Sequence, residues 1–136
     1  MALESPFGHR VHRVYDLDDD TDLRIVGLSK NQQRADRIIH FVECHHAVVE
    51  DKGRAQPVKK GIAQLNNTIE NAKLSNIKFA ILVKEKIPRG EQGYYSWNHT
   101  SMRVTYKQSN WRPVTLARDL PLYMLTPRQA KSYGLE

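Results

Sequence analysis

Residues 35–53 read ADRIIHFVECHHAVVEDKG, and this stretch decides the fold. It holds two segments rich in β-branched residues, Arg37–Val42 and Ala47–Lys52, which are typical of strands. A parallel pair needs a crossover of about a dozen residues or more, and only a short turn separates these segments. The stretch therefore predicts an antiparallel hairpin, with Cys44 and its histidine neighbours at or beside the turn.

The hairpin is expected to bring polar side chains together at one end. Side chains two apart in a strand lie on the same face, so Glu50 and Lys52 project together while Asp51 points away. Asp36 begins the partner strand, and antiparallel pairing places it near the later end of the Glu50 strand. The sequence therefore predicts two carboxylates and one lysine in close proximity.

Such a grouping suits metal-assisted phosphate chemistry. Mg²⁺ takes oxygen ligands, and its phosphate-processing sites typically offer one or two carboxylates with positions left for water and substrate. Asp36 and Glu50 would be these ligands, with the backbone carbonyl of Asp51 as a third. Lys52 would orient or deprotonate the attacking water, or stabilise negative charge in the transition state. The alternative interpretation is a surface Glu-Lys cluster, worth on the order of a few tenths of a kcal/mol.

After the hairpin, the spacing of apolar residues changes. From Val58 to Ala72 they recur at steps of three and four, which predicts a helix opened by Pro57 and ending near Ser75. The next segment, Ile77–Lys84, reads IKFAILVK and is typical of a strand in the middle of a sheet. The predicted core is thus strand, strand, helix, strand.

The flanking segments are expected to add further strands. Upstream, an acidic loop from Asp16 to Asp22 is expected to join two extended pieces, His12–Tyr15 and Leu23–Leu28. Downstream, Thr126 is expected to cap a final helical turn opened by Pro127. The strands expected before that turn are Met102–Lys107, Val114–Leu116 and Leu122–Leu125.

The order ADRIIHFV, turn, AVVEDKG, and then a helix bearing QL resembles the PD-(D/E)XK nuclease superfamily. This superfamily includes restriction endonucleases, junction resolvases and repair nucleases. The resemblance covers about residues 36–84 and implies a restriction endonuclease-like core: a mixed central β-sheet flanked by helices, with Mg²⁺ or Mn²⁺ as cofactor.

The family's functional positions map onto individual residues of this chain. Asp36 matches the first motif aspartate, and Glu50 and Lys52 match the two fixed positions of the second motif. Gln64 matches a glutamine that some branches place on the following helix. Two features depart from the pattern, because Ala35 replaces the proline that names the motif and no helix is evident before the first strand.

Length and composition favour one soluble domain. A chain of 136 residues buries a single core, so residues 1–136 are expected to form one nuclease-like domain. Hydrophobic content of 40% and charged content of 26% exclude disordered and collagen-like classes. No apolar run approaches the roughly 18 residues needed to cross a bilayer, and the N-terminal residues lack a secretory h-region. With Cys44 as the single cysteine, a cytoplasmic location is expected.

The net charge of +6 is unevenly distributed. Residues 1–51 carry ten acidic and six basic side chains, whereas residues 52–136 carry five and fifteen. Lysine and arginine interleaved with aromatic residues suit binding to a phosphate backbone, so DNA is the expected partner. The side chains expected to contact phosphates are Arg103, Lys107, Arg112 and Arg118. Trp97 or Trp111 would stack on bases or belong to the core.

Two other metal-binding interpretations fit less well. Potential zinc ligands cluster at His40, Cys44, His45 and His46. Three consecutive ligands at a turn match no standard zinc spacing, and only the isolated His99 follows. Residues 97–99 (WNH) suggest a histidine-metal type of nuclease, but they lack the strand-strand-helix surroundings of that class.

The sequence therefore predicts an α/β domain that hydrolyses phosphodiester bonds in DNA with Mg²⁺ and acts as a homodimer. The alternative is a catalytically inactive module that retains the nuclease fold for DNA binding or assembly. A base-reading module such as a helix-turn-helix is not recognisable, so the kind of DNA substrate does not follow from the sequence.

Overall fold

The computed structural model describes residues 10–31, 34–42, 44–52, 58–84, 95–97, 104–106, 116–132 and 134–135. The side chains of Lys52, Val58, Lys59, residues 95–97, Thr105 and Tyr106 lie outside this description. In chain order the elements are β1 (Val11–Asp16), α1 (Asp20–Ile25), β2 (Arg37–Phe41), β3 (His46–Lys52), α2 (Val58–Asn71), β4 (Ile77–Lys84), β5 (Tyr95–Trp97), β6 (Val104–Tyr106), η2 (Ala117–Asp119), β7 (Leu122–Leu125) and α3 (Pro127–Ser132).

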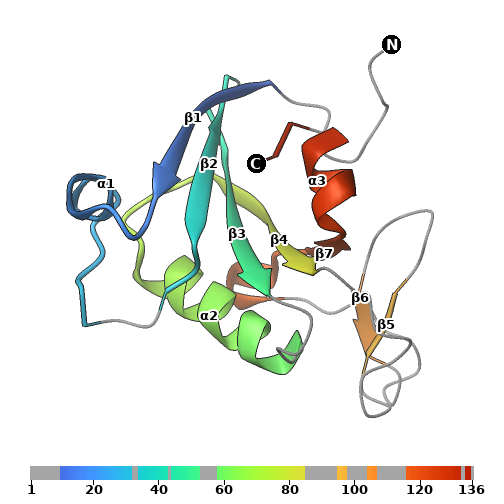
Figure 1. Ribbon diagram of the computed structural model, residues 1–136. Helices are drawn as coiled ribbons and strands as arrows, with labels where there is room; N and C mark the ends of the chain where they lie inside the picture. The colour runs from blue at the N-terminus through green and yellow to red at the C-terminus, as the bar shows by residue number, and fades with distance from the viewer. Residues whose placement is uncertain are drawn as a thin grey trace.

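The strands form a five-stranded mixed sheet in the order β1-β2-β3-β4-β7 (Figure 1). β1, β2 and β3 are antiparallel neighbours, whereas β3, β4 and β7 run parallel. β5 and β6 make a separate two-stranded sheet. The prediction of an α/β fold with a mixed sheet flanked by helices is therefore confirmed.

The predicted hairpin is β2 and β3. Their antiparallel register pairs His40 with His46 and Arg37 with Val49. At the turn Cys44 has a φ of 65°, a left-handed conformation that reverses the chain within a few residues. The Cys44 N–H donates to the Phe41 carbonyl at 3.0 Å. A tight turn leaves little freedom of register, and this fixes which residues meet at the far end of the hairpin.

The helix and strand predicted after the hairpin are also present. α2 ends at Asn71, somewhat before the expected Ser75, and Pro57 lies outside the described residues. α2 carries the chain from β3 to β4, which makes the two strands parallel neighbours. The β4 boundaries coincide with the predicted Ile77–Lys84.

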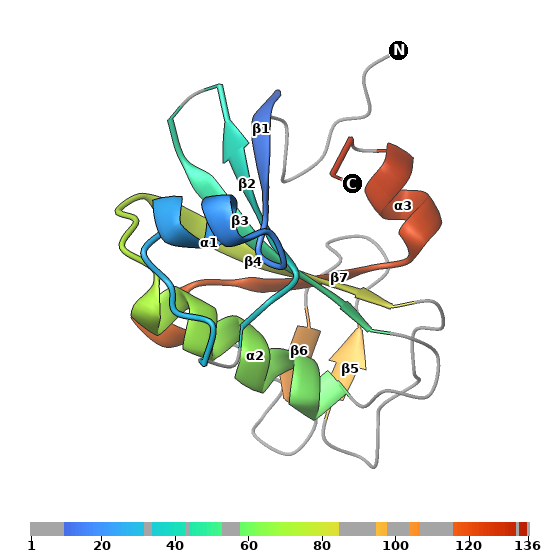
Figure 2. The same ribbon diagram turned by 60° about the vertical axis from the view of Figure 1, so that its left-hand side comes forward.

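The sheet has a different helical cover on each face (Figure 2). On the α2 side, Ile38, Val48 and Leu82 pack with helix residues such as Leu65, and with apolar residues of α1 and its flanks. On the other side, alternate strand residues pack against Ala130 of α3 and against Leu135. The buried strand residues on that side are Ile39, Phe41, Ala47, Val49, Phe79, Ile81, Val83 and Leu125. Because side chains alternate along a strand, neighbouring residues serve two different cores.

The segment Leu23–Leu28 is not extended as predicted, because the short helix α1 occupies Asp20–Ile25. The Asp19 side chain caps the helix by accepting from the Asp22 N–H at 3.0 Å. Asp20 and Asp22 lie in the first turn, where negative charge is favourable for the helix dipole. The acidic run that suggested a loop therefore starts a helix.

The C-terminal predictions hold where the structure describes them. β7 spans the expected Leu122–Leu125, and β6 lies within the expected Met102–Lys107, whose other residues are outside the described part of the chain. Thr126 begins α3 with a capping box: its Oγ1 accepts from the Gln129 N–H at 3.2 Å, and Gln129 Oε1 accepts from the Thr126 N–H at 2.9 Å. The expected strand at Val114–Leu116 lies largely outside the described residues. β5 and η2 were not anticipated from the sequence. Within the described ranges, every helix is too short or too polar to cross a bilayer.

Candidate functional site

Asp36 lies immediately before β2, where the hairpin register brings it opposite Glu50. Arg37 pairs with Val49 in an antiparallel register, so Asp36, one residue earlier, lies opposite Glu50, one residue later. The Asp36 N–H donates to the Val49 carbonyl at 3.1 Å, and Asp36 Oδ2 accepts from the Asp51 N–H at 2.6 Å. The Asp36 carboxylate is thus held against the backbone at the end of the Glu50 strand.

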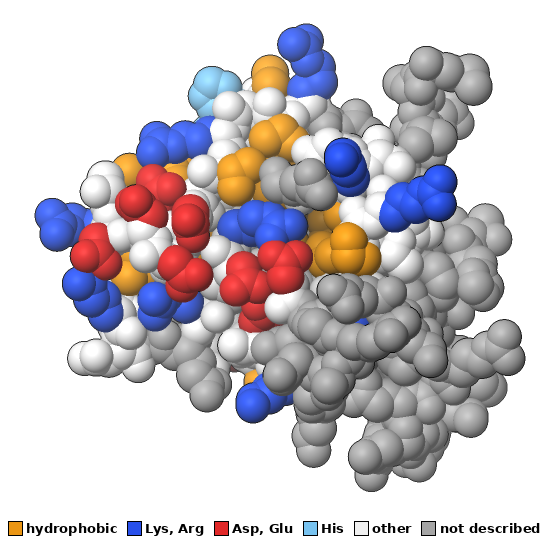
Figure 3. Space-filling view, viewed as in Figure 1, with side chains coloured by type: hydrophobic (Ala, Val, Ile, Leu, Met, Phe, Trp, Pro, Cys, Tyr) orange, Lys and Arg blue, Asp and Glu red, His pale blue; other side chains and the backbone are white. Residues whose placement is uncertain are grey.

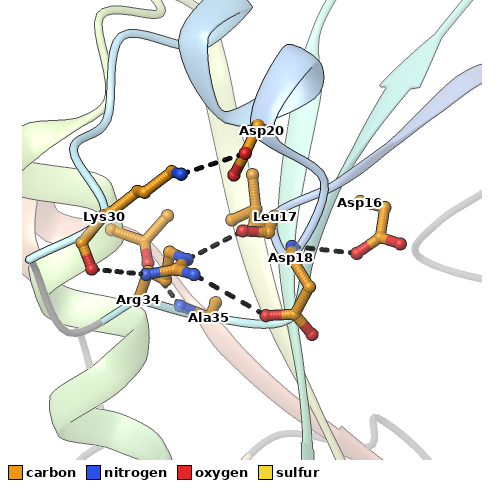
Figure 4. A network of polar contacts seen from close by, with 8 residues as sticks. Asp16, Leu17, Asp18, Asp20, Lys30, Arg34 and Ala35 are labelled. Atoms are coloured by element: carbon orange, nitrogen blue, oxygen red, sulfur yellow. Dashed lines mark hydrogen bonds and ion pairs between the residues drawn. The ribbon is translucent and has the colours of Figure 1, made fainter.

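Arg34 fixes the chain just before Asp36 (Figure 4). Its Nε donates to the Leu17 carbonyl at 2.7 Å, and its Nη1 donates to the Lys30 carbonyl at 3.1 Å. Its Nη2 lies 3.7 Å from Asp18 Oδ1. The planar guanidinium therefore connects the residues just before α1 and just after it to the backbone that precedes β2.

Thr68 of α2 also fixes the backbone just before Asp36, from the side of the helix. This buried hydroxyl accepts from the Ala35 N–H at 2.6 Å and donates to the Gln64 carbonyl at 3.0 Å. The Leu17 N–H donates to the Asp36 carbonyl at 3.0 Å. Asp36 and the residue before it are therefore positioned by contacts from Leu17, which follows β1, from β3 and from α2.

Asp36 lines an open depression of about 540 Å³ at this end of the sheet. Its lining residues are Val14, Asp16, Asp18, Asp36, Arg37 and Asp51. Acidic side chains gather on this face, interspersed with lysine and arginine side chains (Figure 3). Arg37 forms an ion pair with Asp51 and donates to the Leu135 carbonyl at 3.3 Å. Sequence reasoning did not anticipate the depression, because its walls come from segments that meet only in the folded chain.

Glu50 is 1% exposed and does not line this depression. It lies on the α2 face of the sheet, two residues after Val48 of that core. Lys84, at the end of β4, is 3% exposed and was missed by sequence reasoning. The available signal was a lysine ending the apolar run IKFAILVK. The backbone of Lys52 pairs with that of Lys84, while the Lys52 side chain lies outside the described part.

The other predicted site residues are only partly described. Gln64 is half-buried on α2, and its Oε1 is buried without a hydrogen-bond partner among the described residues. Arg118 is exposed in η2 and donates from Nη1 to the Leu74 carbonyl at 3.2 Å, which ties η2 to the connection after α2. The predicted phosphate contacts Arg103, Lys107 and Arg112 lie outside the described residues.

The expected metal donors at the end of the hairpin are two carboxylates and one backbone carbonyl. Asp36 lies opposite Glu50 of the neighbouring strand, but of these two carboxylates only that of Asp36 lines the depression. Within the described ranges, no three His, Cys, Asp or Glu side chains are grouped closely enough to hold a metal ion by themselves. Mg²⁺ sites for phosphate chemistry use one or two carboxylates and complete their coordination with water and substrate, so the two-carboxylate set is compatible with them.

Three histidines form a row across β1, β2 and β3 at the other end of the hairpin. The ring centroids of His12 and His40 are 5.2 Å apart, and those of His40 and His46 are 4.6 Å apart. His45 packs on Phe41 at 4.9 Å. Burial lowers the pKa of His46 below its ordinary value, and the neighbouring His40 and His45 lower it further against opposing backbone hydrogen bonds. The described residues give the zinc interpretation no support.

His46 is expected to make the fold less stable in mild acid. The His46 pKa is lowered in the folded protein, so the unfolded chain binds a proton more readily below about pH 6.5. Stability is therefore lost as the pH falls through 6.5 towards the folded-state pKa, and the loss then levels off. Urea unfolding of the native protein and of His46→Gln, measured from neutral to mildly acidic pH, checks this. The variant should lose part of the pH dependence, and parallel curves would contradict the role of His46.

Comparison of the chain with protein-family models, with curated proteins and with solved structures finds no match. The assignment of a function therefore depends on the residues and geometry described above.

Proposed function

We propose that this chain is a Mg²⁺- or Mn²⁺-dependent nuclease that hydrolyses phosphodiester bonds in DNA, built on a restriction endonuclease-like core. The observation that carries the proposal is the β2-β3 register, which sets Asp36 opposite Glu50 at the end of the hairpin. The α2 crossover and the parallel strand β4 follow this hairpin directly, in the element order that the sequence resemblance implies.

Each residue of the site has a distinct role in the proposal. Asp36 and Glu50 bind the ion together with the Asp51 carbonyl, and Asp36 is oriented for this by its hydrogen bond from the Asp51 N–H. The ion, when bound, polarises the phosphate and acidifies a bound water. Lys52 orients or deprotonates the attacking water or stabilises the developing charge. Gln64 on α2 is a further polar contact of the site.

The burial of Glu50 supports a specific role for this carboxylate. An ionised carboxylate loses favourable hydration when it is buried, and glutamate is almost never fully buried unless it is paired. Glu50 is nevertheless 1% exposed, on the face of β3 that packs against α2 through Val48. A binding function explains why a charged residue occupies a position that an apolar residue would fill at lower cost.

DNA binding in the proposal depends on the basic half of the chain. Four carboxylates around the depression repel a phosphate backbone, so the substrate must approach by way of a metal ion and basic side chains. We assign the backbone contacts to Arg103, Lys107, Arg112 and Arg118. A homodimer would present two such surfaces to the two strands of a duplex.

Two observations favour the second candidate, an inactive nuclease-fold module for DNA binding or assembly. The Asp51 carboxylate forms an ion pair with Arg37. Glu50 is buried on the α2 face of the sheet and does not line the depression. The same charged groups then act as a structural network, and the basic half alone provides the interaction with DNA.

The deciding experiment incubates the purified protein with labelled duplex, single-stranded, branched and mismatched DNA. Cleavage is expected with Mg²⁺ or Mn²⁺, is expected to stop when EDTA is added, and should coincide with the protein peak in size-exclusion chromatography. The substrate that is cut fastest identifies the DNA structure recognised. Binding of DNA without cleavage of any substrate in either metal would reject the nuclease and support the inactive module.

A further inference from the structure

Arg37 adds a positive charge to the acidic depression at the end of the hairpin. Among the described residues that line this depression, four are aspartates and Arg37 is the one cation. Its side chain is 16% exposed, so the guanidinium is largely enclosed but still reaches the depression. A charged group is rarely enclosed without partners that compensate for its lost hydration. The partners of this guanidinium therefore decide what else it can bind.

The strand register places Arg37 between two carboxylates on the α3 face of the sheet. Arg37 is directly opposite Asp16 of β1 and Val49 of β3. Asp51 follows Val49 by two residues, so it lies on the same face and one diagonal step from Arg37. Val49 belongs to the core packed by α3, which identifies the shared face. The Arg37 side chain is thus on the opposite side of the sheet from Glu50.

The hydrogen bonds of Arg37 use only part of its donor capacity. Its Nη1 donates to the Asp51 carboxylate, and its Nη2 donates to the Leu135 carbonyl at 3.3 Å. Leu135 is fully buried and its own N–H donates to the Ala130 carbonyl at 2.9 Å, so it is a fixed anchor. The Arg37 Nε is buried without a hydrogen-bond partner among the described residues. Arginine carries five N–H donors, so this guanidinium retains capacity for a further acceptor.

The Asp51 carboxylate is the partner of Arg37 that a ligand could replace. It is 49% exposed, and an ion pair at such a position contributes little to stability. A phosphodiester also carries one negative charge and presents two oxygen acceptors, and arginine binds carboxylate and phosphate in the same bidentate geometry. The Leu135 carbonyl would hold the guanidinium in place during such an exchange.

From this arrangement we propose that Arg37 binds a phosphate of the DNA backbone at the depression, in exchange for the Asp51 carboxylate. The inference rests on the proposed function, because it takes DNA as the ligand. The carboxylates around the depression repel the DNA backbone, and Arg37 provides the local attraction that brings a phosphate next to Asp36. Asp51 is paired with Arg37 in the free protein and is released when DNA binds.

The test measures DNA affinity at several salt concentrations, with Ca²⁺ in place of Mg²⁺ so that cleavage does not interfere. Arg37→Gln should lower the affinity about 10-fold or more and reduce the slope of log affinity against log salt by about one. Arg24→Gln, at an exposed position on α1, removes an equal charge outside the depression and should change both quantities far less. Arg37→Lys keeps the charge without the planar pair of donors, so it should retain only part of the affinity.

Asp51→Asn should have the opposite effect, because it releases Arg37 without removing it. The affinity should rise by up to about fivefold, the equivalent of a partly exposed ion pair. Asp18→Asn removes an equal charge from the depression, but Asp18 faces Arg34, so the rise should be smaller. In an Arg37→Gln background, Asp51→Asn should gain no more affinity than Asp18→Asn does.

Equal affinity and an equal salt slope in folded Arg37→Gln would overturn the proposal. If that variant does not fold, Asp51→Asn decides, and an affinity no higher than that of Asp18→Asn would overturn it. DNA binding that depends on Arg37, without cleavage in Mg²⁺ or Mn²⁺, would reject the nuclease function alone. Cleavage with binding that does not depend on Arg37 would reject its role alone, and a native protein that binds no DNA would reject both.

Discussion

Asp36→Asn is expected to reduce Mg²⁺-dependent DNA cleavage roughly 10³-fold, because a metal ion supplies about 4 kcal/mol of charge stabilisation at 1.36 kcal/mol per tenfold in rate. The amide lacks the negative charge that binds the ion. It retains an oxygen that can accept from the Asp51 N–H, which Asp36 Oδ2 does at 2.6 Å. The fold should therefore persist. Single-turnover cleavage rates and thermal unfolding, measured on the same preparations, check both parts.

Asp18→Asn is the matched control for this substitution. Asp18 also lines the depression, but it lies before α1 and faces Arg34 at 3.7 Å. Removing this exposed charge should leave cleavage close to that of the native protein. A similar loss in both variants would indicate a general effect of the acidic surface. Native activity in Asp36→Asn would exclude Asp36 as a metal ligand.

Lys52→Ala is expected to reduce cleavage by roughly 10²- to 10⁴-fold, the usual contribution of a positioned acid or base, while metal and DNA still bind. The metal ligands Asp36 and Glu50 remain in this variant, so the loss should affect the chemical step alone. Cleavage is measured with Mg²⁺, and DNA affinity is measured separately with Ca²⁺ in its place. The two measurements separate the role of Lys52 from that of Asp36, whose substitution should weaken metal binding.

Lys60→Ala provides the comparison, because Lys60 is exposed on α2. It removes an equal charge and should leave the rate of the chemical step unchanged. If Lys52→Ala weakened DNA binding as much as it slowed cleavage, Lys52 would be a contact to the DNA backbone rather than a residue acting on water. Equal cleavage by Lys52→Ala and the native protein would remove it from the site.

The elements nearest the predicted site could be read from the sequence because their signals are local. The short turn allows few registers for β2 and β3, so the position of Asp36 opposite the end of β3 followed from counting residues. The helical spacing of α2 and the apolar run of β4 were equally informative. α1 was misjudged because the capping interaction of Asp19 outweighed the extended preference of Leu23–Leu28.

The features that escaped sequence reasoning depend on tertiary contacts. Lys84 resembled a polar residue ending a strand, and only the register with β3 brings it close to Glu50. The pairing of Arg37 with Asp51 requires the two strands to be in place and adds a positive charge that the sequence analysis did not anticipate. The depression combines β1, β2 and β3 with the segment before α1, and a linear motif does not specify such a combination.

The position of β7 beside β4 has a consequence for the order of folding. β2 and β3 are joined by a short turn, so their pairing requires closure of a small loop. Ala80 instead pairs with Leu122, after an excursion of the chain that includes the separate β5-β6 sheet. Closing a longer loop costs more entropy, and non-local strand pairing is slow. The hairpin that carries Asp36 and Glu50 can thus assemble early, whereas the edge formed by β7 completes the sheet late and is the part from which reversible opening would begin.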